Sequence, residues 1–345
     1  MEFGIFTQFD VRNERSVHDS ITEWVDTAIE ADAMGVDCFW LAEFHFRKFT
    51  PLSAPLIVAS AIAARTRRMK VGIAVQLLPL ANPIRLAEDC AMLDHLSGGR
   101  FVYGVGRSSF LDSYQGFGVD YALSRSMFAE ALNVLRLAWG EEPFTFEGEY
   151  FNFHNVNVVP KPYQQPHPEI RVACESRASF PLMGGMQVPI MIRHQYELAE
   201  LKSLLGEYVE ARQQAGAAGR GHVTLQTTAY LAETGDRARS EARESTLHER
   251  QIAILQRSGR YADAEAAARA AALAPGQGGE PAYEDIIKRR LYGAPEEVID
   301  RLHEYRETLG IDAISLNINP GGQIPRDRVR NSVRLLMEKV APAFN

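Results

Sequence analysis

The stretch Arg171–Ser179 (RVACESRAS) carries several groups that could bind an anion. A short apolar run that ends at Cys174 indicates a buried strand, and an acidic residue follows it. Ser176 and Ser179 come next, with Arg177 between them, in the spacing of a first helical turn. The free N–H groups of a helix N-terminus, two hydroxyls and a guanidinium all suit a phosphate. The alternative is a capped helix without a ligand, because serine is a good N-cap.

Other candidate site residues follow other apolar runs that we expect to be strands. They are Gln8 and Asp10, Ser108, Ser109 and Phe110, Arg193 and His194, and Asn317 and Asn319. The carboxyl ends of parallel strands meet at one edge of a sheet, where ligands bind. Arg193 and His194 could bind an anionic substrate or stabilise a hydroperoxide, and we predict both as catalytic candidates. The alternative is that they are ordinary polar residues at a helix entry.

Strand and helix patterns alternate along the whole chain. Eight strand candidates stand out, at 3–9, 38–42, 70–78, 101–105, 170–174, 188–192, 223–232 and 313–318. Amphipathic patterns separate most of them, which predicts a parallel sheet with right-handed crossovers. Eight repeats favour a (β/α)8 barrel. The alternative, an open doubly wound sheet, is weakened because no Gly-x-Gly-x-x-Gly follows the first strand.

The chain is longer than a bare barrel requires. A (β/α)8 barrel typically needs about 250 residues, so we predict one barrel domain over 1–345 with insertions near 141–168 and 234–292. The first is expected to be a β-hairpin that turns at Gly148. The second is rich in Ala and Arg and then breaks at Pro275–Pro281. It is either a lid over the active site or an inert surface insertion.

Composition excludes several classes of partner. The net charge of −7, from 37 basic and 44 acidic side chains, gives no reason to expect nucleic acid or an anionic membrane. No apolar run approaches the roughly 20 residues of a membrane helix, and no signal peptide is recognised, so we predict a cytoplasmic protein. Cys38, Cys90 and Cys174 lack metal-ligand spacing. We interpret them as buried apolar residues and predict no metal site.

Four motifs together resemble the bacterial luciferase-like monooxygenase family. They are WLAEFHF at 40–46, SGGRFVYGVGR at 97–107, ACES at 173–176 and GAPEE at 293–297. The resemblance implies a (β/α)8 barrel that binds reduced FMN at its C-terminal mouth. It also implies a two-component monooxygenase, in which a separate reductase supplies the flavin. O₂ would form a C4a-hydroperoxide that oxygenates a small organic substrate.

The resemblance also assigns cofactor-binding residues. The flavin phosphate would bind Arg107, Arg125, Glu175, Ser176 and Ser179, where guanidinium groups can form charge-assisted bonds to it. The alternative for Arg125 is an ion pair with a glutamate at a helix start. The flavin ring would lie against the third strand at Ala74 and Val75, and the family often has a cis peptide bond there.

One motif departs from the family pattern. Luciferase-like proteins often carry Glu-His-His-Phe after the second strand, whereas this chain has Glu43-Phe-His-Phe46. Phe44 therefore stands at the catalytic position, and a phenyl ring cannot transfer protons. His45 remains a catalytic candidate, or it is a buried residue that acts in support. We predict that Phe6, Gln8, Phe44 and Phe110 line the substrate pocket.

Two other functions stay open at this point. The chain could be an oxidoreductase that uses the deazaflavin F420 on the same fold, or a flavin-binding protein without catalysis. The resemblance further implies a homodimer that forms through the helices expected at Ser53–Ala64 and Pro83–Leu96.

Overall fold

Eight parallel strands form a closed barrel in the computed structural model, which describes residues 1–11, 15–256 and 283–344. The strands are β1 (Glu2–Thr7), β2 (Cys38–Leu41), β3 (Lys70–Leu77), β4 (Phe101–Gly106), β7 (Glu169–Ala173), β8 (Ile190–Arg193), β9 (Val223–Leu231) and β11 (Ala313–Asn317). They pair in chain order, and β9 contacts both β8 and β11, which closes the ring. The predicted (β/α)8 barrel is confirmed.

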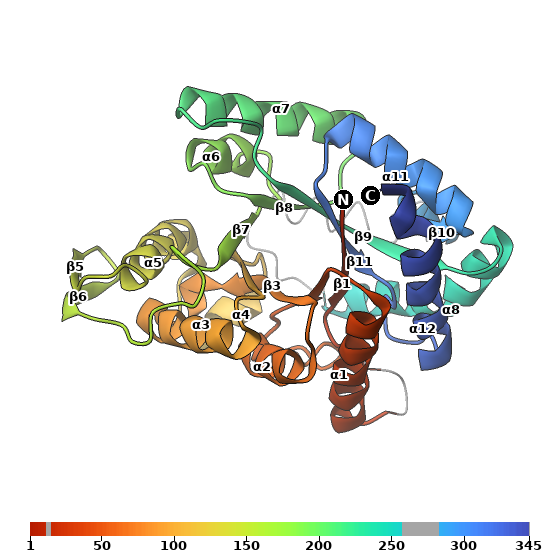
Figure 1. Ribbon diagram of the computed structural model, residues 1–345, viewed down its shortest axis with the longest axis horizontal. Coiled ribbons are helices and arrows are strands. Elements are labelled where there is room, and N and C mark those ends of the chain that lie inside the picture. Colours follow the sequence, from red (N-terminus) through yellow and green to blue (C-terminus); the bar gives the residue numbers. More distant parts are fainter. Residues whose placement is uncertain (12–14, 257–282, 345) are drawn as a thin grey trace.

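Helices surround the barrel (Figure 1). The longer ones are α1 (Val17–Met34), α2 (Pro55–Arg65), α3 (Pro83–Ser97), α5 (Ser124–Ala138), α7 (Leu198–Gln214), α8 (Gly235–Gln256), α11 (Pro295–Leu309) and α12 (Arg326–Leu335). The short ones are α4 (Leu111–Phe117), α6 (Ser179–Gly185) and α10 (Tyr283–Ile287). The two chain ends lie together, and the Met1 amino group donates to the Phe344 carbonyl at 3.1 Å. None of the described helices is both long and apolar enough to cross a membrane.

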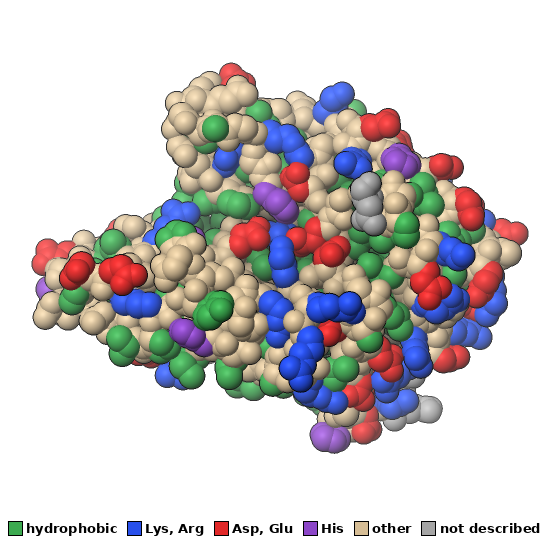
Figure 2. Space-filling model, in the orientation of Figure 1, with side chains coloured by type: hydrophobic (Ala, Val, Ile, Leu, Met, Phe, Trp, Pro, Cys, Tyr) green, Lys and Arg blue, Asp and Glu red, His purple; other side chains and the backbone are tan. Residues whose placement is uncertain are grey.

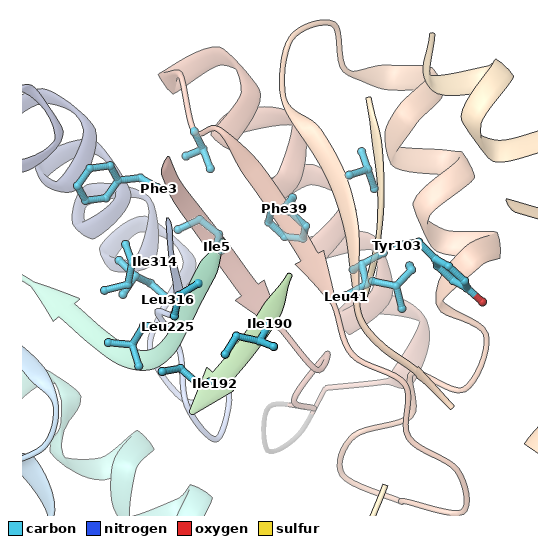
Figure 3. Close-up of a cluster of buried hydrophobic side chains, with 14 of the residues drawn as sticks. Phe3, Ile5, Phe39, Leu41, Tyr103, Ile190, Ile192, Leu225, Ile314 and Leu316 are labelled. Carbon is cyan, nitrogen blue, oxygen red and sulfur yellow. The ribbon is translucent and has the colours of Figure 1, made fainter. Parts of the chain in front are cut away.

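The core lies between the barrel wall and the helices. Outward-facing strand residues such as Ile5, Phe39 and Leu316 are fully buried against the helix layer (Figure 3). Successive strand residues point to opposite faces, so their neighbours face the lumen. The lumen is filled at its middle by Trp40. A Cβ on Gly72 would stand 2.2 Å from the Trp40 ring, which explains a glycine there.

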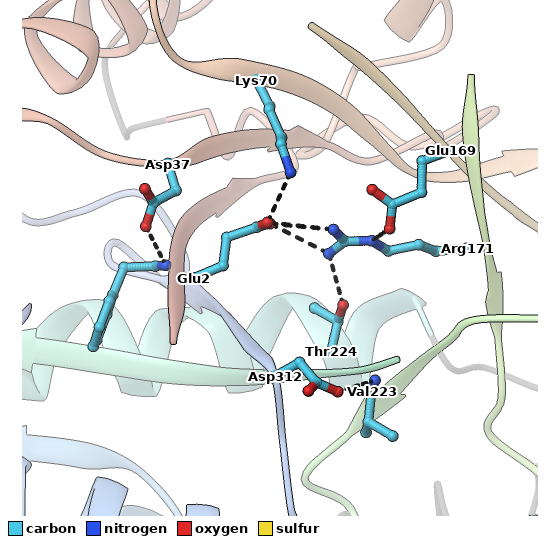
Figure 4. A network of polar contacts seen from close by, with 9 residues as sticks. Glu2, Asp37, Lys70, Glu169, Arg171, Val223, Thr224 and Asp312 are labelled. Atoms are coloured by element: carbon cyan, nitrogen blue, oxygen red, sulfur yellow. Dashed lines mark hydrogen bonds and ion pairs between the residues drawn. The ribbon is translucent and has the colours of Figure 1, made fainter. Parts of the chain in front are cut away.

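The N-terminal end of the lumen holds a network of charged side chains (Figure 4). Arg171, 1% exposed, bonds Glu169 at 2.8 Å, Glu2 at 3.3 Å and the Thr224 hydroxyl at 2.8 Å. Lys70 adds a 3.0 Å contact to Glu2. Burial alone would raise the pKa of the Glu2 carboxyl, but Arg171 and Lys70 together hold it below its ordinary value. This end of the barrel is therefore closed by paired charges.

The first predicted insertion is confirmed as a hairpin. Strands β5 (Phe144–Glu147) and β6 (Asn152–Val156) pair antiparallel on either side of Gly148, at the edge of the molecule beside α5. In the second insertion, α8 is helical as expected. The short strand β10 (Leu291–Gly293) pairs in parallel with the last residues of β9. The lid hypothesis rests on Pro275–Pro281, which lies outside the described residues.

Candidate functional site

The third strand is irregular where the flavin ring was expected. The Ala74–Val75 peptide bond is cis, as expected, and the β3–β4 register gains one residue between Ile73 and Gln76. Ala74 and Val75 consequently both pack with the lumen cluster. A Cβ on Gly106 of β4 would stand 2.5 Å from the Val75 side chain. Gly106 therefore makes room for the Val75 side chain at this edge of the mouth.

Two arginines lie at the junction of β4 and α5. Arg107 follows β4, is half-buried, and donates to the buried Ser124 hydroxyl at 3.0 Å. Arg125 is exposed in the first turn of α5, which contains no acidic residue. Neither arginine forms an ion pair with a described residue, so the alternative of an Arg125–glutamate pair is not observed. A cation at a helix N-terminus is electrostatically unfavourable, and a bound anion would compensate for both charges.

The end of β7 supplies hydroxyls next to these arginines. β4 and β7 are neighbours in the sheet, so Arg107 and Ser176 leave it at the same edge. The Ser176 hydroxyl has no hydrogen-bond partner among the described residues. Ser179, by contrast, donates to the Ser176 carbonyl and lies 3.2 Å from the Cys174 sulfur. Ser176 is thus ready to donate to a phosphate, whereas the Ser179 proton is already used.

Two details of the expected anion site are wrong. The helix after β7 begins at Ser179 with Ala178 as its N-cap, and no side chain caps it. Arg177 turns away from the serines, pairs with Glu200 of α7 and lies over the Tyr196 ring. The reason is that a turn at 176–178 separates the strand from the helix. The side chains left to form the expected anion site are consequently those of Arg107, Arg125 and Ser176, without a serine-capped helix.

Glu175 is held by β8 and the residues that follow it. Its carbonyl accepts from Gln195 at 2.6 Å and from the Tyr196 hydroxyl at 2.9 Å. Its carboxylate lies 3.7 Å from Arg193. The Glu175 side chain therefore contacts an arginine of the neighbouring strand.

Three of the predicted pocket residues are phenylalanines whose side chains lie close together. Phe6 and Phe44 belong to one lumen cluster with Ala74 and Val75. The Phe44 and Phe110 rings are 6.1 Å apart, and the Arg47 guanidinium lies 4.3 Å above Phe110. These contacts join Phe6, Phe44 and Phe110 into one apolar group beside Ala74 and Val75, which we call the phenylalanine wall.

His45 lies behind this wall in a buried polar cluster. Its Nε2 is 2.9 Å from Glu43, and its ring packs edge-on against Phe117 at 4.7 Å. The other Glu43 oxygen accepts from the Gln76 amide at 2.7 Å and the Leu77 N–H at 2.6 Å. Glu43 therefore ties His45 to the irregular part of β3. This arrangement favours the alternative in which His45 is a buried residue that acts in support, rather than a residue that takes part directly in catalysis.

The two candidates after β8 face opposite ways. Met191 is in the lumen cluster, so alternation directs Arg193 to the mouth and His194 to the helix layer. His194 contacts the Arg289 carbonyl at 3.1 Å and the Tyr305 hydroxyl at 3.3 Å. Burial lowers the pKa of its imidazole. Because its contacts are with the outer layer, we leave His194 out of the proposed site.

The end of β1 carries a buried carboxyl. The Gln8 amide nitrogen lies 3.1 Å and 3.3 Å from the two Asp10 oxygens. Burial, together with the Glu249 carboxylate nearby, raises the pKa of Asp10 well above its ordinary value. Gln8 lies at the mouth as predicted, and Asp10 holds it.

Sequence reasoning missed the partners that hold these residues. Ser124 binds Arg107, and the Tyr114 hydroxyl of α4 donates to the Arg107 carbonyl. Glu43 stands in the WLAEFHF motif and Gln76 in the strand expected at 70–78, but neither received a role. A carboxylate two residues before a histidine was the available signal for the Glu43–His45 contact.

Comparisons with known proteins agree with this geometry. A family model described as luciferase-like monooxygenase matches residues 1–312. The oxygenase component of a flavin-dependent trigonelline monooxygenase from Acinetobacter baylyi is 26% identical, and the match covers 100% of this chain and 96% of that protein.

Solved structures extend the comparison. The monooxygenase RslO1 from Streptomyces bottropensis superposes with a TM-score of 0.83 at 27% identity over 100% of both chains. Two more distant structures share the fold. The oxygenating constituent of 3,6-diketocamphane monooxygenase from Pseudomonas putida, in complex with FMN, gives 0.83 at 22% identity over 99% of this chain and 98% of that one. An F420-dependent secondary alcohol dehydrogenase gives 0.75 at 19% identity over 100% and 99%.

Proposed function

Because this chain belongs to the luciferase-like monooxygenase family, we propose that it uses reduced FMN and O₂ to oxygenate a small organic substrate. One observation carries the proposal. Arg107 and Arg125 stand together at the β4–α5 junction, with no carboxylate partner among the described residues. The Ser176 hydroxyl follows the neighbouring strand, β7. Guanidinium groups are well suited to bidentate bonds with phosphate.

The chain's own residues would mainly bind the flavin and enclose the reacting atoms. The phosphate would bind Arg107, Arg125 and Ser176, which places the ring beside Ala74 and Val75. Bound reduced FMN supplies two electrons, so that one oxygen atom enters the substrate and the other leaves as water. The wall of Phe6, Phe44 and Phe110 would keep bulk water away from the reacting atoms.

No proton transfer is assigned to the Phe44 position. The residue that follows Phe44 is His45, and its imidazole contacts the buried Glu43 carboxylate. We propose that His45 is a positioning residue, because Glu43 binds the Leu77 N–H and Gln76 just beyond the cis peptide.

The cofactor and partner assignments follow from the same proposal. The related trigonelline enzyme is named as an oxygenase component, which supports a separate reductase as the source of reduced FMN. F420 is the alternative cofactor, since an F420-dependent dehydrogenase shares the fold. Charged side chains of both signs are interspersed on the face seen in Figure 2, which gives no support for a nucleic-acid partner.

A homodimer is also part of the proposal. The packed helices α2 and α3 expose large apolar side chains, with Ile57 73%, Leu96 56% and Met92 50% exposed. Such a patch is typical of a subunit interface. Light scattering on the purified chain should give twice the monomer mass, and a monomer at micromolar concentration would remove this part of the proposal.

Rapid mixing tests the proposed reaction. Protein loaded with reduced FMN without oxygen is mixed with O₂, and flavin absorbance is followed. We expect a transient spectrum of oxygenated flavin and a slower return to oxidised flavin than free FMN shows. Return at the rate of free FMN would overturn the proposal. Substrate-dependent reduction of F420 without O₂ consumption would favour the alternative.

A further inference from the structure

One side of the barrel lumen carries neutral polar side chains at its C-terminal half. On β11, Ile314 and Leu316 pack in the outer core, so Ser315 and Asn317 face inward. On β9, Leu225 and Ala229 are in the outer core, so Gln226 and Thr228 face inward as well. Gln8 extends β1, the next strand, with the same alternation as Phe6.

The strand register places these side chains next to one another. Ser315 is opposite Gln226, and Asn317 is opposite Thr228 in the β9–β11 pair. Asn317 is also opposite Phe6 of β1, two residues before Gln8. Because neighbouring strands are about 4.8 Å apart, the five polar residues form one continuous polar surface. We call Gln8, Gln226, Thr228, Ser315 and Asn317 the polar side of the mouth.

The hydrogen-bonding capacity of the polar side is largely unused within the described chain. The Ser315 hydroxyl is fully buried and has no partner. Asn317 accepts from the Asn319 N–H at 3.3 Å, which leaves its amide NH₂ unpaired. Thr228 and Gln226 form no side-chain hydrogen bond with a described residue. Buried polar groups in native proteins normally have a partner, so these groups are suited to a ligand.

The charges beside the polar side are paired or neutral. Arg193 is opposite Gln226 in the β8–β9 pair, and the Glu175 carboxylate lies 3.7 Å from its guanidinium. The carboxyl that contacts the polar side is Asp10, which is 4% exposed and bonded to Gln8. The raised pKa of Asp10, caused by burial and by Glu249, favours the neutral form of that carboxyl. Glu249 itself pairs with Arg290. Amides and hydroxyls both donate and accept, so this surface fits an uncharged group with hydrogen-bonding atoms.

The residues assigned to the cofactor lie on other strands. Ala74, Arg107 and Ser176 belong to or follow β3, β4 and β7, whereas the polar side is formed by β9, β11 and β1. We propose that the polar side binds a neutral hydroxyl or carbonyl group of the substrate, while the phenylalanine wall takes the apolar remainder. The assignment to substrate rather than cofactor rests on the proposed function.

Four probes that share a phenyl ring test this proposal: toluene, benzyl alcohol, acetophenone and benzoate. Their dissociation constants are measured by ligand-observed NMR, on the protein alone and with FMN. Two neutral hydrogen bonds should make benzyl alcohol and acetophenone roughly tenfold tighter binders than toluene. Benzoate should bind no better than toluene, because its charge would lose hydration without gaining an unpaired cation. The neighbouring guanidinium, that of Arg193, already contacts Glu175.

The chain offers a matched pair of variants. Thr228→Val removes a hydroxyl from the polar side, whereas Thr227→Val removes the adjacent hydroxyl, which faces outward to the Arg289 carbonyl at 3.5 Å. Thr228→Val and Ser315→Ala should each reduce the preference for benzyl alcohol over toluene to roughly threefold or less. Thr227→Val should keep it, and all three variants should bind FMN as the parent does.

The outcomes separate the two proposals. Equal effects of Thr228→Val and Thr227→Val, tightest binding of benzoate, or no binding of any probe would each overturn the polar subsite. If FMN binding is retained in that case, the proposed function stands. If FMN does not bind the parent protein, the proposed function falls, and a probe preference on the protein alone would then support only a binding site for neutral polar groups.

Discussion

The two ends of this barrel treat charge in opposite ways. At the N-terminal end, Arg171 is buried among Glu2, Glu169 and Thr224, and Lys70 completes the network. At the C-terminal end, Arg107 and Arg125 have no acidic partner among the described residues, and Asp10 is buried beside Gln8 without a contacting cation.

This difference separates stability from function. In barrels of this type the N-terminal face contributes stability, and the C-terminal face carries the active site. Paired charges use up each other's bonding capacity, so the Arg171 network has nothing left for a ligand. The unpaired arginines and the Ser315 hydroxyl keep that capacity. We therefore propose that the binding site lies at the mouth, where these groups are.

The largest expected effect comes from breaking the paired end. Arg171→Met leaves Glu2 and Glu169 without their shared guanidinium in a buried layer. Removing one partner of a buried ion pair typically destabilises by about 3–5 kcal/mol. Urea unfolding should show this loss, while the affinity of the folded protein for FMN stays the same.

An exposed arginine provides the control for this variant. Arg177 pairs with Glu200 but is 58% exposed, and exposed pairs contribute about 0–1 kcal/mol. Arg177→Met should therefore change the free energy of unfolding by less than about 1 kcal/mol. Equal losses for the two variants would mean that the charged layer is no more important than a surface ion pair.

A smaller effect on stability, which depends on pH, is expected from Asp10 at the C-terminal end of the barrel. The pKa of Asp10 is raised above its ordinary value of 3.8, so the folded state prefers the protonated form. Its contribution to stability is fully present below that ordinary value and is lost as the pH rises through the raised pKa. Relative to Asp10→Asn, the parent should lose about 1.4 kcal/mol per pH unit within this window.

Glu2 should behave in the opposite sense. Its pKa is lowered, so its contribution is present above its ordinary pKa and is lost as the pH falls through the lowered one.

Urea unfolding from pH 4 to pH 8 tests the Asp10 effect, with Asp236→Asn as the control because Asp236 is 98% exposed. Parallel curves for the parent and Asp10→Asn would show that Asp10 is not a buried acid with a raised pKa.

Much of the fold was predictable because alternation and amphipathicity are local signals. All eight barrel strands were found with ends shifted by a few residues, and so was the hairpin around Gly148. Helix α4 (Leu111–Phe117) was missed because it has only seven residues, too few for a hydrophobic period. The turn before α6 was missed because Ser176 and Ser179 have the spacing of a helix cap, although Ala178 is the N-cap.

The site was less predictable because it depends on which way side chains point. Arg193 and His194 follow the strand expected at 188–192, and the sequence alone does not say which of them faces the lumen. Met191 faces it, so alternation directs Arg193 inward and His194 outward. The Glu43 contacts to His45 and Gln76 join two strands, and no local pattern encodes them. The polar side likewise appears only when β9, β11 and β1 are adjacent.

The phosphate site is the central claim, and a comparison of two flavins tests it most directly. Riboflavin has the same ring as FMN but lacks the phosphate. We predict that the parent protein binds FMN at least about tenfold more tightly than riboflavin, because each hydrogen bond to a charged group contributes about 1.5–3 kcal/mol. Arg107→Ala should remove most of that difference and leave riboflavin binding unchanged. Equal affinities of the parent for the two flavins would contradict the account.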